Sequence, residues 1–145
     1  MTTKKSPSAR IQREEELVLA LSQFLASTGY RIRHEVPNMG QSADLVATRG
    51  RWVTIVEAKL RNWRRALEQC RAHEQVADFV CIALLGAQAS DALVREVEST
   101  GYGLVLVSSA DGKCQWITQP TRNKSVWRPQ RRMLSESLRL IRHVD

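Results

Sequence analysis

The segment Phe79–Leu85, with the sequence FVCIALL, contains no polar side chain. Its length suits a β-strand, and a strand without polar alternation must be covered on both faces. Helices therefore have to flank the sheet that contains it. Residues 61–75 and 88–99 carry apolar side chains at helical spacing, and a further strand is expected at residues 103–107. This alternation of strands and helices predicts an α/β layer arrangement with at least one parallel pair.

The chain before this segment predicts one helix followed by three strands. Residues 10–27 show helical spacing, and Gly29 is expected to end that helix as a left-handed cap. Residues 30–36 alternate apolar and polar side chains, which indicates a strand with one buried face. Pro37 is expected to end this strand, so that the following PNMGQS stretch forms a loop.

Two hairpins are expected on either side of the parallel unit. Residues 43–48 and 52–60 form the first, because Gly50 tolerates the positive φ of a tight turn. The second hairpin turns at Gly112, and a last helix opens at Pro129. The fold class is therefore α/β, with a mixed central sheet flanked by helices and an extra C-terminal hairpin and helix.

A single domain accounts for the whole pattern. The 145 residues are 43% hydrophobic, which is enough to bury one core without metals or disulfide staples. We expect a flexible polar tail at residues 1–8 and one domain over residues 9–145. The three cysteines show no CxxC spacing and are expected to be reduced thiols. Cys70 and His73 share a helix face and could ligate a metal, but their apolar neighbours favour core packing.

The chain is strongly basic. Lys and Arg number 22 against 15 Asp and Glu, so the net charge is +7 and the pI is about 9.9. Such a charge favours a polyanionic partner, either nucleic acid or an anionic membrane surface. No apolar run approaches the length of a bilayer span, and the first thirty residues lack a signal-peptide core, so the sequence predicts a cytoplasmic protein. A membrane-surface role would depend on the basic amphipathic helix at residues 129–143.

Two carboxylates and a lysine fall at the end of the first hairpin. Glu57 and Lys59 lie two residues apart on one strand face, about 6–7 Å from each other along the chain. Asp44 on the partner strand falls within one or two residues of direct opposition to Glu57. Neighbouring carboxylates repel, and Mg²⁺ or Mn²⁺ is the ordinary cation that neutralises them. Because such a cation activates water and polarises a phosphoryl oxygen, these parts fit phosphodiester hydrolysis.

This arrangement resembles a known nuclease motif. Ser42-Ala43-Asp44, then twelve residues, then Glu57-Ala58-Lys59, is similar to the PD-(D/E)XK motif of many restriction enzymes, archaeal Holliday-junction resolvases and repair nucleases. The order of elements over residues 10–108 agrees with that family. The resemblance implies a restriction-endonuclease-like αβββαβ core and a Mg²⁺-dependent nuclease acting on DNA. Ala43 stands where the motif has proline, which affects loop geometry rather than metal ligation.

The resemblance also implies roles for individual residues. Asp44 and Glu57 correspond to metal ligands, the backbone carbonyl of Ala58 to a third ligand, and Lys59 to the catalytic lysine. The family often adds a glutamate from the first helix, for which Glu14 is favoured because it shares the inward stripe of that helix. The other candidates for this role are Glu15 and Glu16. Gln69, on the next helix, matches the position of a glutamine that many relatives use near the site.

Arginines follow the motif directly and predict contacts to a sugar–phosphate backbone. Arg61, Arg64 and Arg65 begin the next helix, and Arg49 and Arg51 flank the hairpin turn. Further basic side chains that could widen this surface are Arg71, Arg122, Lys124, Arg128, Arg131 and Arg132.

Interpretations without catalysis also remain open. Glu57 and Lys59 could form a solvent-facing ion pair without function, and the arginines could form a solvated face. Trp63 is expected to anchor the core rather than stack on bases. A non-catalytic basic nucleic-acid-binding subunit with a nuclease-like fold is the alternative function. A homodimer could form through apolar residues of the segment 114–127.

Overall fold

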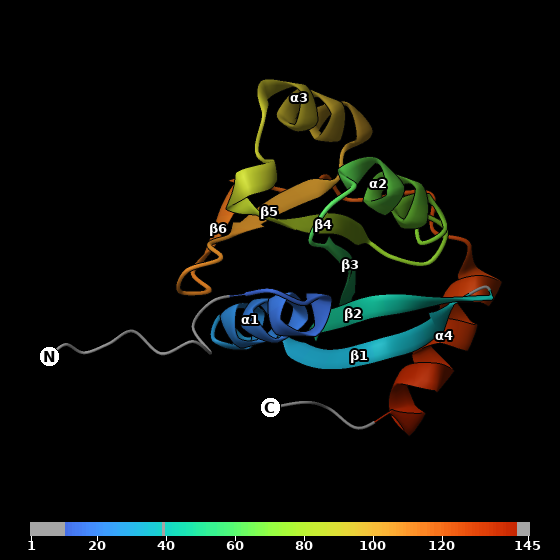
Figure 1. The fold of residues 1–145 in the computed structure, drawn as a ribbon. Coiled ribbons are helices and arrows are strands. Elements are labelled where there is room, and N and C mark those ends of the chain that lie inside the picture. Colours follow the sequence, from blue (N-terminus) through green and yellow to red (C-terminus); the bar gives the residue numbers. More distant parts are fainter. Residues whose placement is uncertain (1–10, 39, 142–145) are drawn as a thin grey trace, which may run out of the picture.

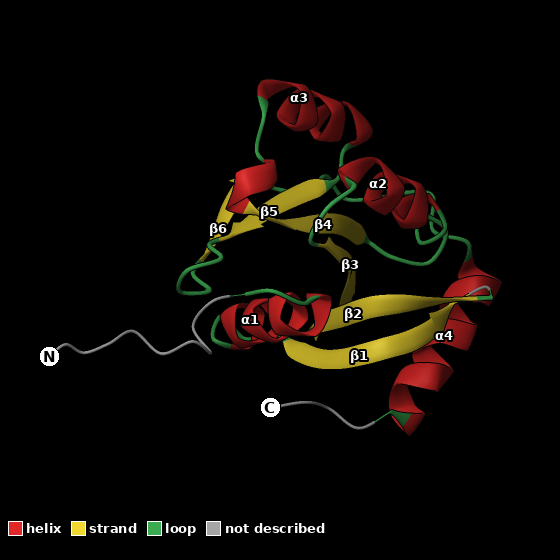
Figure 2. Ribbon diagram, viewed as in Figure 1, coloured by secondary structure: helices red, strands yellow, loops and turns green. Residues whose placement is uncertain are grey.

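The computed structural model describes residues 11–38 and 40–141, so the expected tail at residues 1–8 lies outside the described residues. One six-stranded sheet carries helices on both faces (Figure 1; Figure 2). Its strands are β1 (Arg31–Asn38), β2 (Gln41–Arg49), β3 (Trp52–Lys59), β4 (Phe79–Leu85), β5 (Gly103–Val107) and β6 (Cys114–Thr118). The helices are α1 (Glu14–Ala26), α2 (Trp63–Arg71), α3 (Asp91–Thr100) and α4 (Arg128–Leu140), with a short 3₁₀ turn, η2 (Gly86–Gln88).

The strands lie in the sheet in sequence order, β1 to β6. β1, β2 and β3 form an antiparallel meander, β3, β4 and β5 are parallel, and β6 returns antiparallel to β5. The predicted α/β fold with a mixed sheet flanked by helices is confirmed. Because both parallel crossovers advance in the same direction and share one handedness, α2 and α3 lie on one face (Figure 1).

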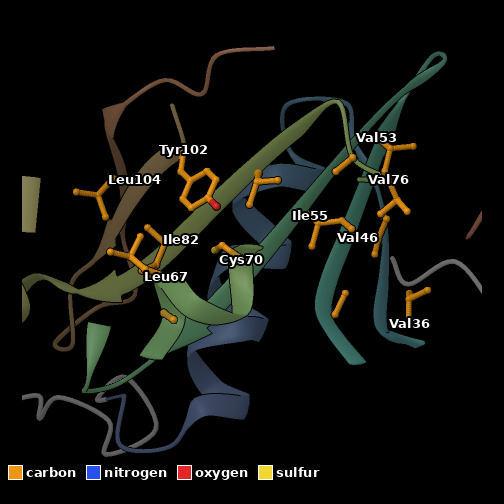
Figure 3. Packing of buried hydrophobic residues seen from close by; sticks show 14 of the residues in the cluster. Val36, Val46, Val53, Ile55, Leu67, Cys70, Val76, Ile82, Tyr102 and Leu104 are labelled. Atoms are coloured by element: carbon orange, nitrogen blue, oxygen red, sulfur yellow. The ribbon is translucent and has the colours of Figure 1, made fainter. Parts of the chain in front are cut away.

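Each face of the sheet has its own buried cluster. On one face α1 covers β-strand side chains such as Leu45, Val56 and Ala83. On the other, α2, α3 and α4 cover a second set that includes Ile55 and Ile82 (Figure 3). β4 contributes side chains to both clusters, as its continuous apolar sequence predicts. The sheet is therefore a rigid middle layer on which a site can be built.

The first strand departs from the expected pattern in two ways. Pro37 was expected to end it, but Pro37 lies inside β1 and pairs with Ser42 of β2. β1 is the edge strand, where a residue without an N–H group is tolerated because one side of the ladder is open. The expected loop PNMGQS is consequently reduced to a tight turn, in which Gly40 has φ +80°.

The second departure is a reversal of the strand's faces. Ile32 was expected to share a face with Val36, but Ile32 packs with α1 and Val36 packs in the opposite cluster. Glu35 has a φ of +52°, a left-handed conformation that breaks the alternation between them. Across the ladder, Ala43 and Leu45 also lie in opposite clusters. β1 and β2 are thus distorted together at the level of Asp44.

Gly103 marks a close approach between β5 and its neighbours. A Cβ atom at this position would lie 2.9 Å from the Cys81 sulfur and 2.9 Å from the Pro120 ring. We expect Gly103→Ala to lower the free energy of unfolding by about 1–3 kcal/mol in urea denaturation. Gly86→Ala is the control, because its Cβ would meet only the Val107 carbonyl oxygen at 3.9 Å, an ordinary contact. Equal stability of the two variants would contradict this packing.

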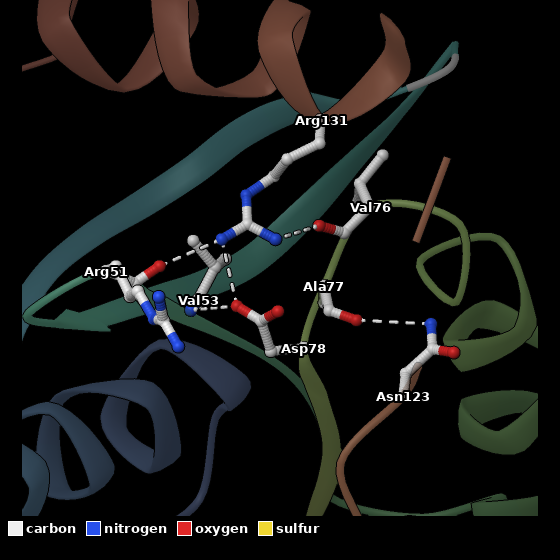
Figure 4. A network of polar contacts seen from close by, with 7 residues as sticks. All are labelled: Arg51, Val53, Val76, Ala77, Asp78, Asn123 and Arg131. Atoms are coloured by element: carbon white, nitrogen blue, oxygen red, sulfur yellow. Dashed lines mark hydrogen bonds and ion pairs between the residues drawn. The ribbon is translucent and has the colours of Figure 1, made fainter. Parts of the chain in front are cut away.

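The C-terminal helix is tied to the sheet by one arginine (Figure 4). The Arg131 guanidinium donates to Asp78 Oδ2 at 2.9 Å and to the carbonyls of Val76 and Arg51, each at 3.0 Å. Asp78 Oδ2 also accepts the Val53 N–H at 2.8 Å. The structure therefore gives Arg131 a structural role in place of the phosphate-binding one expected from the sequence.

The expected apolar interface in the segment 114–127 is divided. Trp116 packs against Phe24 of α1, with ring centroids 6.5 Å apart, and belongs to the core. Ile117 and Trp127 are exposed. None of the helices in the described part of the chain is long and apolar enough to cross a membrane.

Candidate functional site

The site forms where β2 separates from β3. Pairing between the two strands runs from Arg49↔Trp52 to Leu45↔Val56, and continuing that register places Asp44 opposite Glu57. Beyond this point the Asp44 side chain replaces a backbone acceptor of β2: its Oδ2 accepts the Ala58 N–H of β3 at 2.9 Å. β3 stays paired to β4 as far as Lys59, so the separation opens a gap beside a fixed strand.

Glu57 points inward from this gap. Its side chain is 1% exposed, and its Oε2 lies 2.7 Å from Nε2 of the fully buried His73. Val53 and Ile55 precede it on the same strand face, which packs against α2. A buried carboxylate needs hydrogen-bonding partners, and His73 supplies one of them.

The electrostatics of Asp44 reflect its place at the rim. Burial, the largest cause, and the adjacent Glu57 carboxyl raise the pKa of the Asp44 carboxyl, which reaches about 7. The Ala58 N–H and the charge of Lys59 act in the opposite direction and lower that pKa. Two interacting carboxyl groups in a partly desolvated position are where a cation would be stabilising.

An acidic cavity opens at Asp44. It has a volume of about 380 Å³, and Asp44, Ala58, Glu14 and Glu15 line it together with Val18, His34 and Glu35. Glu57 is not among the residues lining it, but its carboxyl makes a side-chain hydrogen bond with that of Asp44. The structure thus brings Asp44, Glu57 and Ala58 together at one point.

The three glutamates at the start of α1 have separate positions. Glu14 lines the cavity, and its Oε2 accepts the Leu60 N–H at 3.4 Å. Glu15 also lines the cavity. Glu16 instead accepts the N–H groups of Gln12 and Arg13 at 2.8 and 3.0 Å, which lowers the pKa of its carboxyl and caps the helix. The favoured candidate Glu14 is therefore beside the site, and Glu16 is not.

A second, basic cavity adjoins the first and shares Glu14 with it. It has a volume of about 430 Å³ and is lined by Gln12, Glu14, Lys59, Leu60, Arg61, Asn62 and Arg65. Asn62 starts α2 by accepting the Arg65 N–H with its side chain. Lys59 and two arginines therefore surround a space next to the carboxylates.

Comparisons with known proteins bear on the fold. Neither protein-family models nor curated proteins give a match. Among solved structures, the chain is similar to the SPO1766 protein of unknown function from Silicibacter pomeroyi. The TM-score is 0.69 and the identity 17%, over 90% of this chain and 86% of that one. At this identity the likeness supports the α/β fold alone.

Several predicted residues lie away from the cavities. Arg49 and Arg51 are at the far end of the hairpin, about 17 Å along the strand from Asp44, given the rise of an extended residue. Arg49 stacks over the Tyr30 ring at 4.3 Å. Neither arginine lines the acidic or the basic cavity, so their contact with a sugar–phosphate backbone stays a prediction.

Residues of α2 divide between the core and the surface. Trp63 packs against the buried cluster, as expected, and the Arg64 guanidinium lies 4.3 Å from its ring centre. Gln69 is partly buried on the same helix and is not among the residues lining either cavity. The three cysteines are free thiols, and Cys70 Sγ donates to the Cys81 carbonyl at 3.6 Å, so the alternative of a Cys70–His73 metal site has no support.

Sequence reasoning missed two histidines near the carboxylates. The sequence places His73 in the apolar core, and it gives no signal that connects His34 to the carboxylates. In the structure His34 lines the acidic cavity, and its Nε2 lies 2.7 Å from Ser22 Oγ. Burial lowers the pKa of His34. Within residues 11–38 and 40–141, no three or more Asp, Glu, His or Cys side chains converge closely enough to form a complete metal cage.

Proposed function

We propose that this chain is a metal-dependent nuclease that hydrolyses phosphodiester bonds of DNA on a restriction-endonuclease-like core. One observation supports the proposal most strongly: Asp44 and Glu57 meet at the point where β2 leaves β3, beside an open cavity. Lys59 follows Glu57 by two residues on β3. The αβββαβ order from α1 to β4, together with the opposed carboxylates, agrees with the PD-(D/E)XK resemblance.

The residues present fit Mg²⁺ or Mn²⁺. Mg²⁺ in proteins is commonly held by one or two carboxylates and retains several waters, so it needs no complete cage of side chains. Asp44 and Ala58 line the acidic cavity, and the Glu57 carboxyl contacts that of Asp44. Two carboxylates would therefore hold the cation, with the Ala58 backbone carbonyl as the third donor implied by the family resemblance. When bound, such a cation polarises a phosphoryl oxygen and offsets charge on the leaving group.

Other side chains around the two cavities stabilise charge and bind the substrate. Lys59 presents an ammonium group beside the carboxylates, where it stabilises negative charge that develops on the phosphoryl oxygens. Arg61 and Arg65 line the same basic cavity and bind the flanking phosphates. Glu14 separates the acidic cavity from the basic one and fixes the Leu60 backbone. The substrate is DNA, and its cleavage is structure-selective or directed by a partner protein. Contacts to backbone phosphates carry no sequence information, because phosphates are common to every sequence.

A plasmid and branched-DNA assay tests the function. We expect nicking of supercoiled plasmid or cutting of a branched duplex with Mg²⁺ or Mn²⁺, and complete loss of cleavage with EDTA. Lys59→Met should reduce the rate by about 10²-fold or more, because a charge positioned on the transition state is removed. Lys113→Met, in the exposed β5–β6 turn, is the matched control and should cut like the unchanged protein.

The same assay separates the alternative function. A non-catalytic basic subunit would bind DNA, with affinity that falls steeply with salt, and would cut nothing in any metal. Cleavage that persists in Lys59→Met would contradict the assignment of Lys59.

A further inference from the structure

His73 is the most buried polar side chain near the carboxylates. It follows α2, is 0% exposed, and both of its ring nitrogens have partners. Nδ1 lies 2.8 Å from Asn38 Nδ2, and Nε2 lies 2.7 Å from Glu57 Oε2. Asn38 is itself 4% exposed at the end of β1. Three buried polar groups from separate parts of the chain therefore form one line that ends on Glu57.

The chemistry of the amide fixes the direction of this line. An amide nitrogen only donates, so His73 Nδ1 must accept the proton of Asn38. In a neutral ring the other nitrogen then carries the hydrogen, and Nε2–H donates to Glu57 Oε2. Asn38 thus selects the tautomer, and the tautomer makes His73 a donor to the carboxylate.

This contact restrains one oxygen of Glu57, and a side-chain hydrogen bond joins the Glu57 carboxyl to that of Asp44, so the two carboxyl groups are held side by side. Carboxylates that ligate metals are commonly held by a further hydrogen bond of this kind, which keeps the ligating oxygen in place. Any buried imidazole needs partners for both ring nitrogens, and here the acceptor for Nε2 is the Glu57 carboxylate rather than a backbone carbonyl. We infer that His73, oriented by Asn38, is a positioning residue that holds Glu57 for cation binding next to Asp44. The inference rests on the proposed function.

Mn²⁺ affinity without nucleic acid measures this role directly. By calorimetry, we expect His73→Phe to raise the Kd for Mn²⁺ by about 10- to 100-fold, the usual effect of losing such a partner. His73→Gln keeps an N–H donor at a similar reach and should restore the Kd to within about threefold. Thr54→Val removes another buried polar group of β3, on the strand face opposite Glu57, and should leave the Kd unchanged.

The tautomer gives an independent readout in the metal-free protein. ¹⁵N NMR of the imidazole should show the Nε2–H form for His73, and Asn38→Leu should destroy that preference. An Nδ1–H form in the unchanged protein overturns the inference, whether or not His73→Phe folds.

The binding outcomes separate the two proposals. If Mn²⁺ binds the unchanged protein and His73→Phe equally well, the positioning role is wrong while the metal site stands. If Mn²⁺ fails to bind the unchanged protein even at millimolar concentration, the proposed function is wrong, and the role of His73 with it.

Discussion

Asp44→Asn should remove DNA cleavage and, at the same time, make the metal-free protein more stable above pH 7. The loss of activity should reach about 10³-fold, since one of two metal-binding carboxylates is gone and several kcal/mol of transition-state stabilisation go with it. Asparagine keeps an oxygen that can accept the Ala58 N–H and gains an N–H₂ group that can donate to Glu57. The fold therefore loses nothing that the carboxylate supplied.

The gain in stability follows from the raised pKa of Asp44. Its ordinary value of 3.8 applies to the unfolded chain, and burial raises it to about 7 in the folded protein. The protonated form is thus favoured by folding, so this contribution is complete below about pH 4 and is lost as the pH rises through 7. Because Asp44 is partly open to solvent, we expect only part of this effect. The free energy of unfolding of Asp44→Asn should exceed that of the unchanged protein by about 1–2 kcal/mol at pH 8.

Urea denaturation in EDTA at pH 5 and pH 8 measures this difference. The unchanged protein should lose stability between the two pH values relative to Asp44→Asn. Asp91→Asn, an exposed carboxylate on α3, is the control and should neither impair cleavage nor raise stability. A destabilised Asp44→Asn at pH 8 would mean that the carboxylate is a structural acceptor. Unchanged cleavage would exclude it as a ligand.

The features predicted well from the sequence depend on local periodicity. The apolar segment Phe79–Leu85 does become a strand covered on both faces, and the turn at Gly50 does set a hairpin register that opposes Asp44 and Glu57. Each of these expectations needs only the spacing of residues within one or two elements. A spacing of two or 3.6 residues determines which side chains share a face before any tertiary contact forms.

The failures arise where tertiary structure overrides that spacing. Nothing local to β1 indicates that Glu35 adopts φ +52°, because left-handed conformations are uncommon for glutamate and cost about 1 kcal/mol or more. The distortion lies opposite Asp44, and it moves Val36 to the other face and keeps His34 toward α1. A regular alternation was therefore the wrong expectation at the one level of the sheet where the site forms.

The contacts of His73 illustrate a second limit. Its partners, Glu57 and Asn38, are 16 and 35 residues away in sequence, and no spacing rule connects a turn after a helix to the ends of two strands. The one available signal was a histidine among apolar residues with no stated hydrogen-bonding partner. A buried imidazole must be satisfied, so asking which carboxylate is near enough to satisfy it would have pointed to the site.

The second large effect concerns stability and the attachment of α4. Arg131→Met keeps the aliphatic stem but removes donors to Asp78 and to the carbonyls of Val76 and Arg51. Asp78 is 7% exposed, so it is left with the Val53 N–H and no cation. Breaking a buried ion pair from one side leaves an uncompensated charge, and we expect a loss of about 2–4 kcal/mol in the free energy of unfolding.

Arg132→Met is the matched control, because it removes the same charge from an exposed position of the same helix and should change stability by less than about 0.5 kcal/mol. Adding Asp78→Asn to Arg131→Met should recover part of the loss, since the unpaired charge is then gone and the amide can still accept the Val53 N–H. The coupling between the two substitutions should be about 1–3 kcal/mol. If Arg131→Met and Arg132→Met unfold at the same urea concentration, the arginine does not fasten α4 to the sheet, and its charge would again be free to contact phosphate.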